Sequence, residues 1–450
     1  MRILLRLSNY IGRIYRNLFL IYPFTKRIMH SPSSFLHMVK SYALQQMPQS
    51  GTLLIKTAFL GTEPIPFRIL PSLAATSYLN VVLPCWAVNQ MSGGPNTVIN
   101  IAYRMAEKGV PIRFISAFTP FETDPELMWS HIQKLTGIRQ RFPHVEVVCA
   151  CDRSREVNIG ENDVFMATMW GTAHIIKHAL PLMRSKKFIY FIQDFEPGFY
   201  NWSTEYALAL ETYEMNYSAI INNPFLAEHF FTNRTGQFGK LDFDKECVIL
   251  KTAVDKTRFY YQENRDNRRK KRLCFYARPS ARRNLFELGT AALIQALDQK
   301  LFSPKEWDFF FMGEQIAPIQ HPSGMTIQCL PWLNYDEYAA NLRETDIVLS
   351  LMLSPHPSYP PLEAAGCGAL VVTNTYGCKT AERLVDISGN IIPVSSTLKG
   401  IVDGLTAALN RIDNFSDRRL HSETNLFNDW EEAFAEVMPH IMQIWKKTTI

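Results

Sequence analysis

The sequence predicts an α/β protein with two βαβ arrays, each built around a mostly parallel sheet. From residue 79 onward, short runs rich in β-branched and aromatic residues alternate with helix-length amphipathic stretches, which is the pattern of βαβ units. Several of the runs are apolar throughout, as expected of parallel strands buried on both faces. A polar, strongly basic stretch at 256–272 divides the series in two. We therefore expect two Rossmann-like domains that face a central cleft.

The first array is expected to form the N-terminal domain, residues 76–255. Its predicted strands are 79–84, 112–118, 145–151, 163–169, 188–193, 218–222 and 247–250, and its predicted helices include 96–108, 172–183 and 203–215. The basic stretch 256–272 ends in Arg268-Arg-Lys-Lys-Arg272. A charge run of this kind is most often solvated, so we interpret it as an interdomain linker.

The second array is expected to form the C-terminal domain, residues 273–424. Its predicted strands are 273–277, 308–312, 325–330, 346–353, 369–373 and 390–394, and its predicted helices are 284–297, 335–343, 361–366 and 398–411. The last segment, 425–450, is predicted to hold one helix at 425–447 with apolar residues along one side, which could pack across both domains.

Charge is unevenly distributed along the chain. Residues 1–62 hold eight Lys and Arg residues and no Asp or Glu, whereas the whole chain of 450 residues has a net charge of +5, which leaves −3 for the rest. Apolar and basic residues interleave there at near-helical spacing, so we expect 1–75 to be a basic amphipathic segment. It is either a reversible membrane-surface anchor or a helix packed on its own protein. The modest total charge argues against nucleic-acid binding.

Cysteine and histidine usage predicts neither disulfides nor a metal site. The eight cysteines include no C-x-x-C pair, and a reducing cytoplasm is the natural compartment. His174 and His178 are four residues apart, but Ile175 stands where the HExxH motif has Glu. No run of 18 apolar residues predicts a membrane-spanning helix. We expect a cytoplasmic protein, with the inner face of the plasma membrane as a further site.

Two segments predict anion binding. Gly93 and Gly94 lie in Ser92-Gly-Gly-Pro-Asn-Thr97, between a predicted strand and helix, where backbone N–H groups can approach a phosphate. The pattern is neither a dinucleotide fingerprint nor a P-loop, and it is also compatible with a simple turn. In the second array, Arg278, Arg282 and Arg283 lie at the carboxyl end of the first strand and the start of the next helix. Arginines there can bind a phosphate bidentately.

The segment Ser354-Pro-His-Pro-Ser-Tyr-Pro-Pro-Leu-Glu363 is the most informative in the chain. Prolines end the preceding strand, Ser358 and Tyr359 lie near a helix start, and Glu363 follows in its first turns. Backbone N–H groups here could hold a phosphate, and the carboxylate could accept hydrogen bonds from sugar hydroxyls. Pro331-Trp332 ends another strand of this array, so Trp332 could flank a nucleotide base beside the same cleft.

A third cluster follows a strand of the first array, in Gln193-Asp-Phe-Glu-Pro-Gly-Phe-Tyr-Asn-Trp202. Asp194 and Glu196 could direct one carboxylate toward a hydroxyl group. Phe195, Phe199, Tyr200 and Trp202 supply flat faces that suit a sugar ring. The alternative is structural: the carboxylates cap the helix near Ser203 and the aromatic residues belong to the core.

These motifs resemble the GT-B glycosyltransferases that carry two glutamates eight residues apart in the donor site, and the resemblance covers about residues 79–444. Ala277-Arg-Pro, Ala281-Arg-Arg-Asn-Leu-Phe-Glu-Leu-Gly289, Gln193-Asp-Phe-Glu-Pro197 and Ser358-Tyr-Pro-Pro-Leu-Glu363 look most like the WsaF-type rhamnosyltransferases. Those enzymes use dTDP-L-rhamnose to build bacterial surface glycans. The first glutamate of the pair would fall at Pro355, so its role is missing or displaced to His356 or Ser358.

The resemblance implies a role for each motif. The N-terminal domain binds the acceptor through Glu196, Tyr200 and Trp202, and Asp194 orients or deprotonates the acceptor hydroxyl. The donor site comprises Gly93, Gly94, Arg278, Arg282, Arg283, Trp332, Ser358, Tyr359 and Glu363, with Arg278 as a catalytic group that stabilises the departing diphosphate and Glu363 on the ribose. No cofactor or metal is implied.

The implied activity is transfer of a deoxyhexose, L-rhamnose from dTDP-L-rhamnose above all, to a growing surface polysaccharide or lipid-linked glycan. Two alternatives remain open. A nucleotide-sugar epimerase shares the two-domain architecture but needs no acceptor. A non-catalytic glycan-binding protein at the membrane surface would be consistent with the missing first glutamate.

Overall fold

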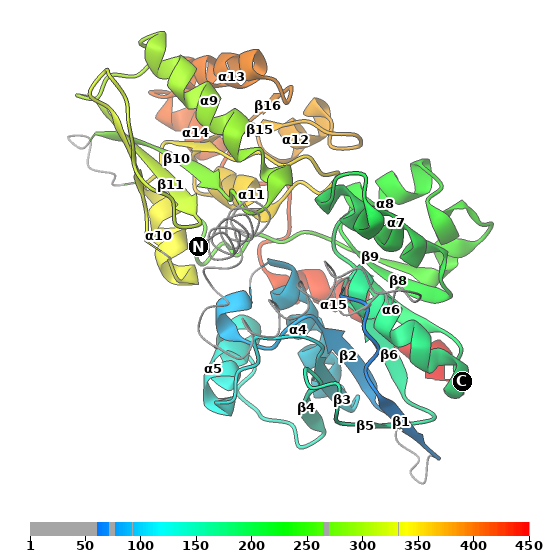
Figure 1. The fold of residues 1–450 in the computed structure, drawn as a ribbon. Helices are drawn as coiled ribbons and strands as arrows, with labels where there is room; N and C mark the ends of the chain where they lie inside the picture. Colours follow the sequence, from blue (N-terminus) through cyan, green and yellow to red (C-terminus); the bar gives the residue numbers. More distant parts are fainter. Residues whose placement is uncertain (1–60, 72–76, 92, 264–269, 332, 450) are drawn as a thin grey trace, which may run out of the picture. The chain divides into compact units, whose positions relative to one another are not determined.

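The computed structural model describes residues 61–71, 77–91, 93–263, 270–331 and 333–449. The predicted basic segment therefore lies outside the described residues up to position 60, as do the centre of the predicted linker and Trp332. Within the described ranges the strands form two seven-stranded sheets and one two-stranded sheet (Figure 1).

The first sheet is a doubly wound parallel sheet. Its strands, in spatial order, are β4 (Val145–Cys149), β3 (Ile112–Ser116), β2 (Leu79–Leu83), β6 (Val164–Ala167), β7 (Phe188–Ile192), β8 (Tyr217–Asn222) and β9 (Cys247–Leu250). All neighbouring pairs are parallel. The order reverses between β2 and β6, as in Rossmann folds, where ligands bind beyond the carboxyl ends of the strands.

Helices cover both faces of the first sheet, which explains why β2 and β7 are buried along their whole lengths. One apolar core joins the sheet to α4 (Gly93–Glu107), α5 (Pro125–Thr136) and α15 (Trp430–Thr449). The core on the other face includes α6 (Trp170–Ala179) and α8 (Pro224–Thr232). Helix α7 (Thr204–Glu211) follows the β7 loop and contacts α6.

The second sheet has the same winding. Its strands, in spatial order, are β12 (Ile319–Gln320), β13 (Thr326–Cys329), β11 (Trp307–Gly313), β10 (Lys271–Ala277), β14 (Ile347–Leu349), β15 (Leu370–Asn374) and β16 (Ile391–Val394). Among these described strands only the β12–β13 pair is antiparallel. One face packs on α9 (Phe286–Asp298) and α13 (Leu398–Arg411), and the other on α10 (Tyr335–Arg343), α11 (Tyr359–Gly366) and α12 (Ala381–Ile387).

The remaining elements are short. A parallel pair outside the main sheets is formed by β1 (Phe67–Leu70) and β5 (Val157–Gly160), and α14 (Phe415–Leu420) follows α13. Single 3₁₀ turns lie at Val88–Gln90, Leu180–Leu182, Glu196–Phe199, Thr212–Glu214, Gly236–Gly239, Phe243–Glu246 and Arg282–Asn284. No helix in the described part of the chain is long and apolar enough to cross a bilayer.

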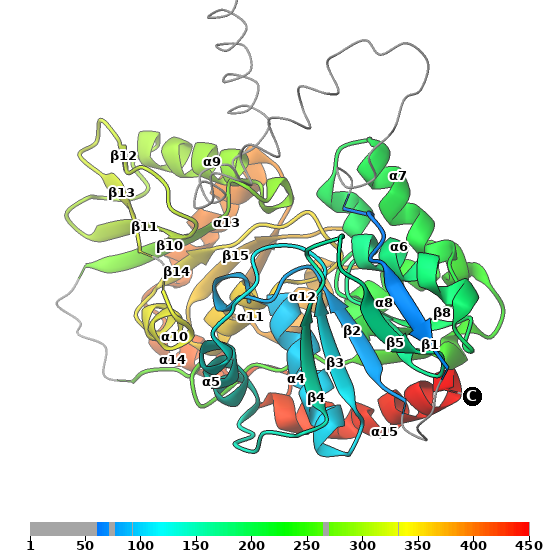
Figure 2. The same ribbon diagram turned by 60° about the horizontal axis from the view of Figure 1, so that its bottom comes forward.

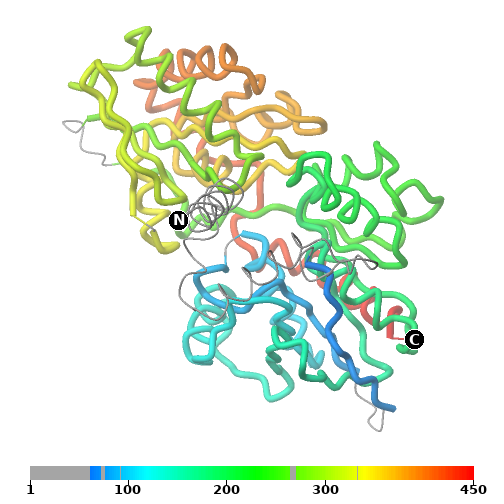
Figure 3. Tube along the Cα trace, in the orientation of Figure 1, coloured from blue at the N-terminus to red at the C-terminus, as the bar shows by residue number. Residues whose placement is uncertain are grey.

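Two segments run side by side where the chain passes between the sheets. Residues 253–256 pair in parallel with 427–428, because Val254 N–H donates to Phe427 O at 3.0 Å and Lys256 N–H to Asn428 O at 2.9 Å. The trace then continues from the second array into α15 (Figure 3). Apolar residues of α15 belong to the core of the first sheet, and Figure 2 shows the helix running along that domain. The ring of Trp430, its first residue, lies 5.7 Å from Tyr359 of α11.

The predicted α/β fold class with two Rossmann-like arrays is confirmed, and all thirteen predicted strands are present. Several predicted boundaries were wrong; the helices predicted at 172–183 and 203–215, for example, end at Ala179 and Glu211. The predicted strand 346–353 ends at Leu349, because the chain turns there into the loop that holds Ser354. The predicted terminal helix begins at Trp430 and not at residue 425, because residues 427–428 pair with residues 253–256 instead.

Candidate active site

Asp194 lies at the point where the two arrays meet. It follows the carboxyl end of β7 and is buried. The hydroxyl of Ser354, from the loop after β14, donates to Asp194 Oδ1, and Arg283 Nε lies 3.5 Å from Asp194 Oδ2. The Phe195 N–H also donates to Oδ1 at 2.8 Å. A carboxylate of the first domain is thus held between a hydroxyl and a guanidinium of the second.

Arg283 has the features of an anion-binding arginine. Its guanidinium lies 3.9 Å from the centre of the Phe199 ring, and its backbone carbonyl accepts from Leu353 N–H at 2.8 Å. Among the described residues its Nε has no hydrogen-bond partner, and burial lowers the pKa of the group. A half-buried guanidinium whose Nε has no hydrogen bond favours an anionic ligand.

The other two predicted arginines differ from Arg283. Arg278 Nε lies 3.5 Å from Glu314 Oε1, and Glu314 also accepts from Ser280 N–H at 3.1 Å. Arg282 is exposed. Of the three, Arg283 is therefore the one that the structure brings to Asp194, while Arg278 is already engaged with a carboxylate.

The loop between β14 and α11 is ordered by its own side chains. Ser354 Oγ accepts from His356 N–H at 3.0 Å, and His356 Nδ1 accepts from Ser358 N–H at 2.9 Å. Burial lowers the pKa of His356 to about 4 against the opposing charge of Asp194, so the ring is neutral at pH 7. Ser358 has a φ of 69°, a strained value for a side-chain-bearing residue. Pro355, at the position of the first glutamate, is buried.

The predicted glycine turn lies beside these residues. Gly93 and Gly94 open α4, and Gly93 has a φ of 33°. A Cβ atom at position 94 would lie 2.1 Å from Gln193 Oε1, so a side chain there would displace Gln193. That oxygen is buried and has no partner among the described residues. The first turn of α4 thus meets the strand end that precedes Asp194.

Tyr359 and Glu363 occupy the first turns of α11. Asn222, at the end of β8, donates to Tyr359 Oη at 3.0 Å, which ties α11 to the first domain. Tyr338 donates to Glu363 Oε2 at 2.7 Å. Burial raises the pKa of Glu363 to about 7, against the hydrogen bond from Tyr338.

The three predicted acceptor residues do not behave alike. Glu196 is buried and accepts from Trp170 N–H at 2.5 Å, at the start of α6. Tyr200 accepts from Trp170 Nε1 at 2.9 Å. Trp202 is 96% exposed. The helix after Ser203 is capped by Ser203 itself, which accepts from Tyr206 N–H at 3.3 Å, so Glu196 caps α6 and not α7.

Burial of Glu196 predicts a pH-dependent stability. Burial raises its pKa from 4.5 to about 8, while the Trp170 N–H opposes the shift. The folded state then binds more protons than the unfolded state between these values, so Glu196 makes the free energy of unfolding fall as pH rises through that window, by up to about 1.4 kcal/mol per pH unit. A Glu196→Gln variant keeps an acceptor for the Trp170 N–H and should lack this fall. Denaturant titrations at pH 5, 6, 7 and 8 measure the difference.

The control for this variant is Glu431→Gln, at an exposed position on α15, which should follow the wild-type pH dependence. Parallel curves for the wild type and Glu196→Gln would show that Glu196 does not hold a proton in the folded protein.

Sequence reasoning missed several residues of this region. Ser354 contacts Asp194 directly, Asn222 bonds Tyr359, and Lys379 is buried in the loop after β15 with Nζ donating to Met352 O at 2.8 Å. Asn222 ends a predicted strand and Lys379 lies in the loop after another, and this position at the carboxyl ends of strands is the available signal. Tyr338 lies on α10, and no local pattern connects it to Glu363.

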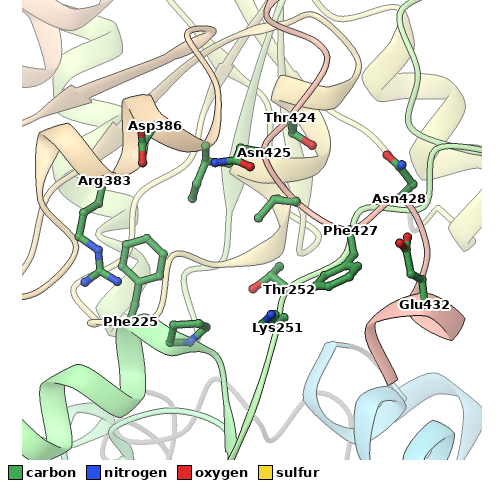
Figure 4. Close-up of a pocket in the computed structure, with 13 residues that line it drawn as sticks. Phe225, Lys251, Thr252, Arg383, Asp386, Thr424, Asn425, Phe427, Asn428 and Glu432 are labelled. Atoms are coloured by element: carbon green, nitrogen blue, oxygen red, sulfur yellow. The ribbon is translucent and has the colours of Figure 1, made fainter. Parts of the chain in front are cut away.

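A cavity of about 600 Å³ lies away from Asp194, beside the paired segments 253–256 and 427–428. Phe225, Lys251 and Thr252 of the first domain line it together with Arg383 and Asp386 of α12, and Thr424, Asn425, Phe427 and Asn428 of the returning chain close it (Figure 4). Its described lining includes none of the residues predicted to bind donor or acceptor. This cavity is therefore distinct from the site around Asp194.

Comparisons with known proteins agree with this architecture. The chain is similar to HepE of Anabaena, solved with UDP and glucose, at 12% identity over 81% of this chain and 100% of that one, with a TM-score of 0.55. It is similar to sucrose-phosphate synthase of Thermosynechococcus elongatus at 11% identity over 82% and 100% of the two chains, with a TM-score of 0.57. These likenesses show the GT-B fold.

Sequence comparisons identify the family. An O-antigen biosynthesis protein, RfbC of Myxococcus xanthus, is 34% identical over 248 residues, which are 55% of this chain but only 18% of that protein. The family model of the WsaF N-terminal domain matches residues 78–223, and that of the WsaF C-terminal domain matches residues 271–406. Since the two matches together span more than half of the chain, and each covers strands of one of its two large sheets, the protein belongs to the WsaF family.

Proposed function

We propose that this protein is a glycosyltransferase that moves a deoxyhexose, L-rhamnose from dTDP-L-rhamnose above all, to a surface polysaccharide or lipid-linked glycan. The contact that supports it most is the meeting of Asp194 with Arg283 and Ser354. Glycosyl transfer needs a group that handles the acceptor proton and, opposite it, positive charge for the leaving diphosphate. Membership of the WsaF family and the name of the Myxococcus relative support the same proposal.

In this proposal Asp194 orients the acceptor hydroxyl and accepts its proton. The hydroxyl oxygen forms the new bond to the anomeric carbon, and the bond from that carbon to the diphosphate breaks with its electron pair leaving on the phosphate oxygen. Arg283, assisted by Arg278 and by the first turns of α4 and α11, stabilises the charge that develops there. Arg282, exposed at the edge, steers the donor.

Glu363 binds the sugar of the nucleotide. Its buried carboxyl is fixed by Tyr338 at 2.7 Å, and its carboxylate accepts a hydrogen bond from a ribose hydroxyl, the 3′-hydroxyl in the case of dTDP. The pair Tyr200 and Trp202 lies in the loop that follows Asp194, where an acceptor sugar can stack. Residues 1–62 would bring the enzyme to an anionic membrane and its lipid-linked acceptor.

Calorimetric titration with dTDP, UDP and GDP tests the donor class. We expect dTDP to bind most tightly of the three. Preference for UDP or GDP would refute the dTDP-sugar assignment while leaving glycosyl transfer intact, and binding of none of the three would refute the proposed function itself.

A Glu363→Gln variant tests the ribose contact. Because burial places the pKa of Glu363 at about 7, the carboxylate population rises between pH 6 and 8, and wild-type affinity for dTDP should rise with it. Loss of a hydrogen bond to a charged acceptor should weaken dTDP binding about tenfold at pH 8 and remove this pH dependence. The exposed Glu431→Gln serves as control. Unchanged affinity in Glu363→Gln would remove Glu363 from the site.

A further inference from the structure

Lys379 is a buried cation that the proposed chemistry does not use. It lies between β15 and α12 with a side chain that is 0% exposed. Its Nζ donates to the Met352 carbonyl at 2.8 Å, and that carbonyl also accepts from Asn374 Nδ2 at 3.1 Å. The Met352 N–H in turn donates to Asn374 Oδ1 at 2.7 Å. Through this hydrogen bond Lys379 holds the Met352 peptide, which precedes the loop that contains Ser354.

The charged surroundings of Lys379 include Asp194. Burial lowers the pKa of Lys379 to about 7, and the negative charge of Asp194 opposes that shift. The positive charge of Lys379 in turn acts on His356, together with Arg283. Hydrogen bonds also connect the two residues, because the Met352 carbonyl that accepts from Lys379 accepts from Ser354 N–H at 3.0 Å, and Ser354 Oγ donates to Asp194. Arg283 and His356 are the basic groups beside them.

Burying the charges of Lys379 and Asp194 costs free energy unless the two charges compensate each other. A buried ammonium group loses its hydration, and Met352 O satisfies one of its three donors. Asp194 is also buried, at 7% exposure, and Arg283 Nε lies 3.5 Å from its Oδ2. A second cation near the carboxylate stabilises its charged form.

We propose that Lys379 is a positioning residue for Asp194: it supplies a second buried counter-charge to that carboxylate and, through Met352, holds the loop that presents Ser354 to it. The proposal rests on the proposed function only in giving Asp194 a chemical role. The electrostatic coupling between Lys379 and Asp194 is a property of the folded protein, and it can be measured without an activity assay.

A double-mutant cycle on the full chain tests the coupling. The free energy of unfolding is measured for the wild type, Lys379→Met, Asp194→Asn and the double variant. At pH 6, below the Lys379 pKa of about 7, the two substitutions should be non-additive by tenfold or more in the unfolding equilibrium constant, because either one alone leaves a buried charge with less compensation. At pH 9, where Lys379 has lost its proton, the coupling should shrink.

Lys399→Met is the matched control, since Lys399 is exposed and pairs with Asp403 on α13. It should be additive with Asp194→Asn at both pH values. If the effects of Lys379→Met and Asp194→Asn are additive, or if their coupling is equal at pH 6 and pH 9, the proposal is overturned. The role of Lys379 would then be limited to its hydrogen bond with Met352. Should a single variant fail to fold, the cycle is run with Lys379→Gln in place of Lys379→Met.

Kinetics supply the second readout. Lys379→Met should lower kcat about tenfold at pH 6 with KM for the donor changed less than threefold, since Lys379 acts through Asp194 and not on the donor. A rise in donor KM with kcat unchanged would make Lys379 a donor-binding residue and contradict the proposal. An inactive wild-type enzyme with intact coupling in the cycle would refute the proposed function but not the electrostatic pairing.

Discussion

Asp194→Asn should lower kcat by about 10²–10⁴-fold, the range expected when a positioned general base is removed. The amide keeps the shape of the side chain and its acceptor oxygen for Ser354, but it can neither take up the acceptor proton nor pair with Arg283. Donor affinity measured by calorimetry should change little. Initial rates of sugar transfer at saturating donor and acceptor measure the effect.

Asp403→Asn is the control for this substitution, since Asp403 is an exposed carboxylate on α13 paired only with Lys399 in the described structure. It should have wild-type kcat. If Asp194→Asn also retained wild-type turnover, the base would have to be sought elsewhere, and the interdomain contact at Asp194 would be structural.

Arg283→Ala should lower kcat by about a hundredfold or more, the loss seen when one preorganised electrostatic donor is removed from a transition state. Arg283 is half-buried against Phe199 with an unsatisfied Nε, so water screens its interaction with the departing diphosphate only in part. Arg278→Ala should have a smaller effect, because Glu314 already neutralises part of the Arg278 charge.

Two further substitutions sharpen the test of Arg283. Arg283→Lys should recover only part of the activity, since an ammonium cannot stack on Phe199 or bind two phosphate oxygens in a fork. Arg155→Ala, at an exposed position of the first domain, should have wild-type kcat. An Arg283→Ala enzyme with unchanged kcat would remove this residue from the diphosphate site.

The sequence predicted the fold well because its strongest signals are local. Buried parallel strands such as β6 and β7 appear as continuous apolar runs, so the sequence predicts their positions directly. The missed α5 and α8 begin at Pro125 and Pro224, after Asp124 and Asn223, which cap them. An Asp or Asn followed by Pro is a signal for a helix start, but it is not part of the alternation of apolar runs from which the elements are predicted.

The candidate site was predictable only in part, because its contacts cross between the domains. Asp194 and the arginines were found as separate clusters, each at a strand end. That Arg283, rather than Arg278 or Arg282, meets Asp194 depends on how the turn at 282–284 is held, with Leu353 N–H bonded to Arg283 O. No spacing along the chain encodes that choice. Likewise, the sequence around Glu196 predicts a carboxylate near a sugar site, whereas in the structure Glu196 accepts a hydrogen bond from the first N–H group of α6.

Donor consumption, measured with and without acceptor, tests the central claim most directly. The wild-type protein is incubated with dTDP-L-rhamnose and a rhamnosylated lipid acceptor, and both products are followed by mass spectrometry. The proposed transfer requires release of dTDP matched by one added deoxyhexose on the acceptor, dependent on Asp194 and Arg283. Conversion of the donor to an isomeric nucleotide sugar without acceptor would indicate an epimerase, and binding of the glycan without any turnover would indicate a non-catalytic binding protein; either result would contradict it.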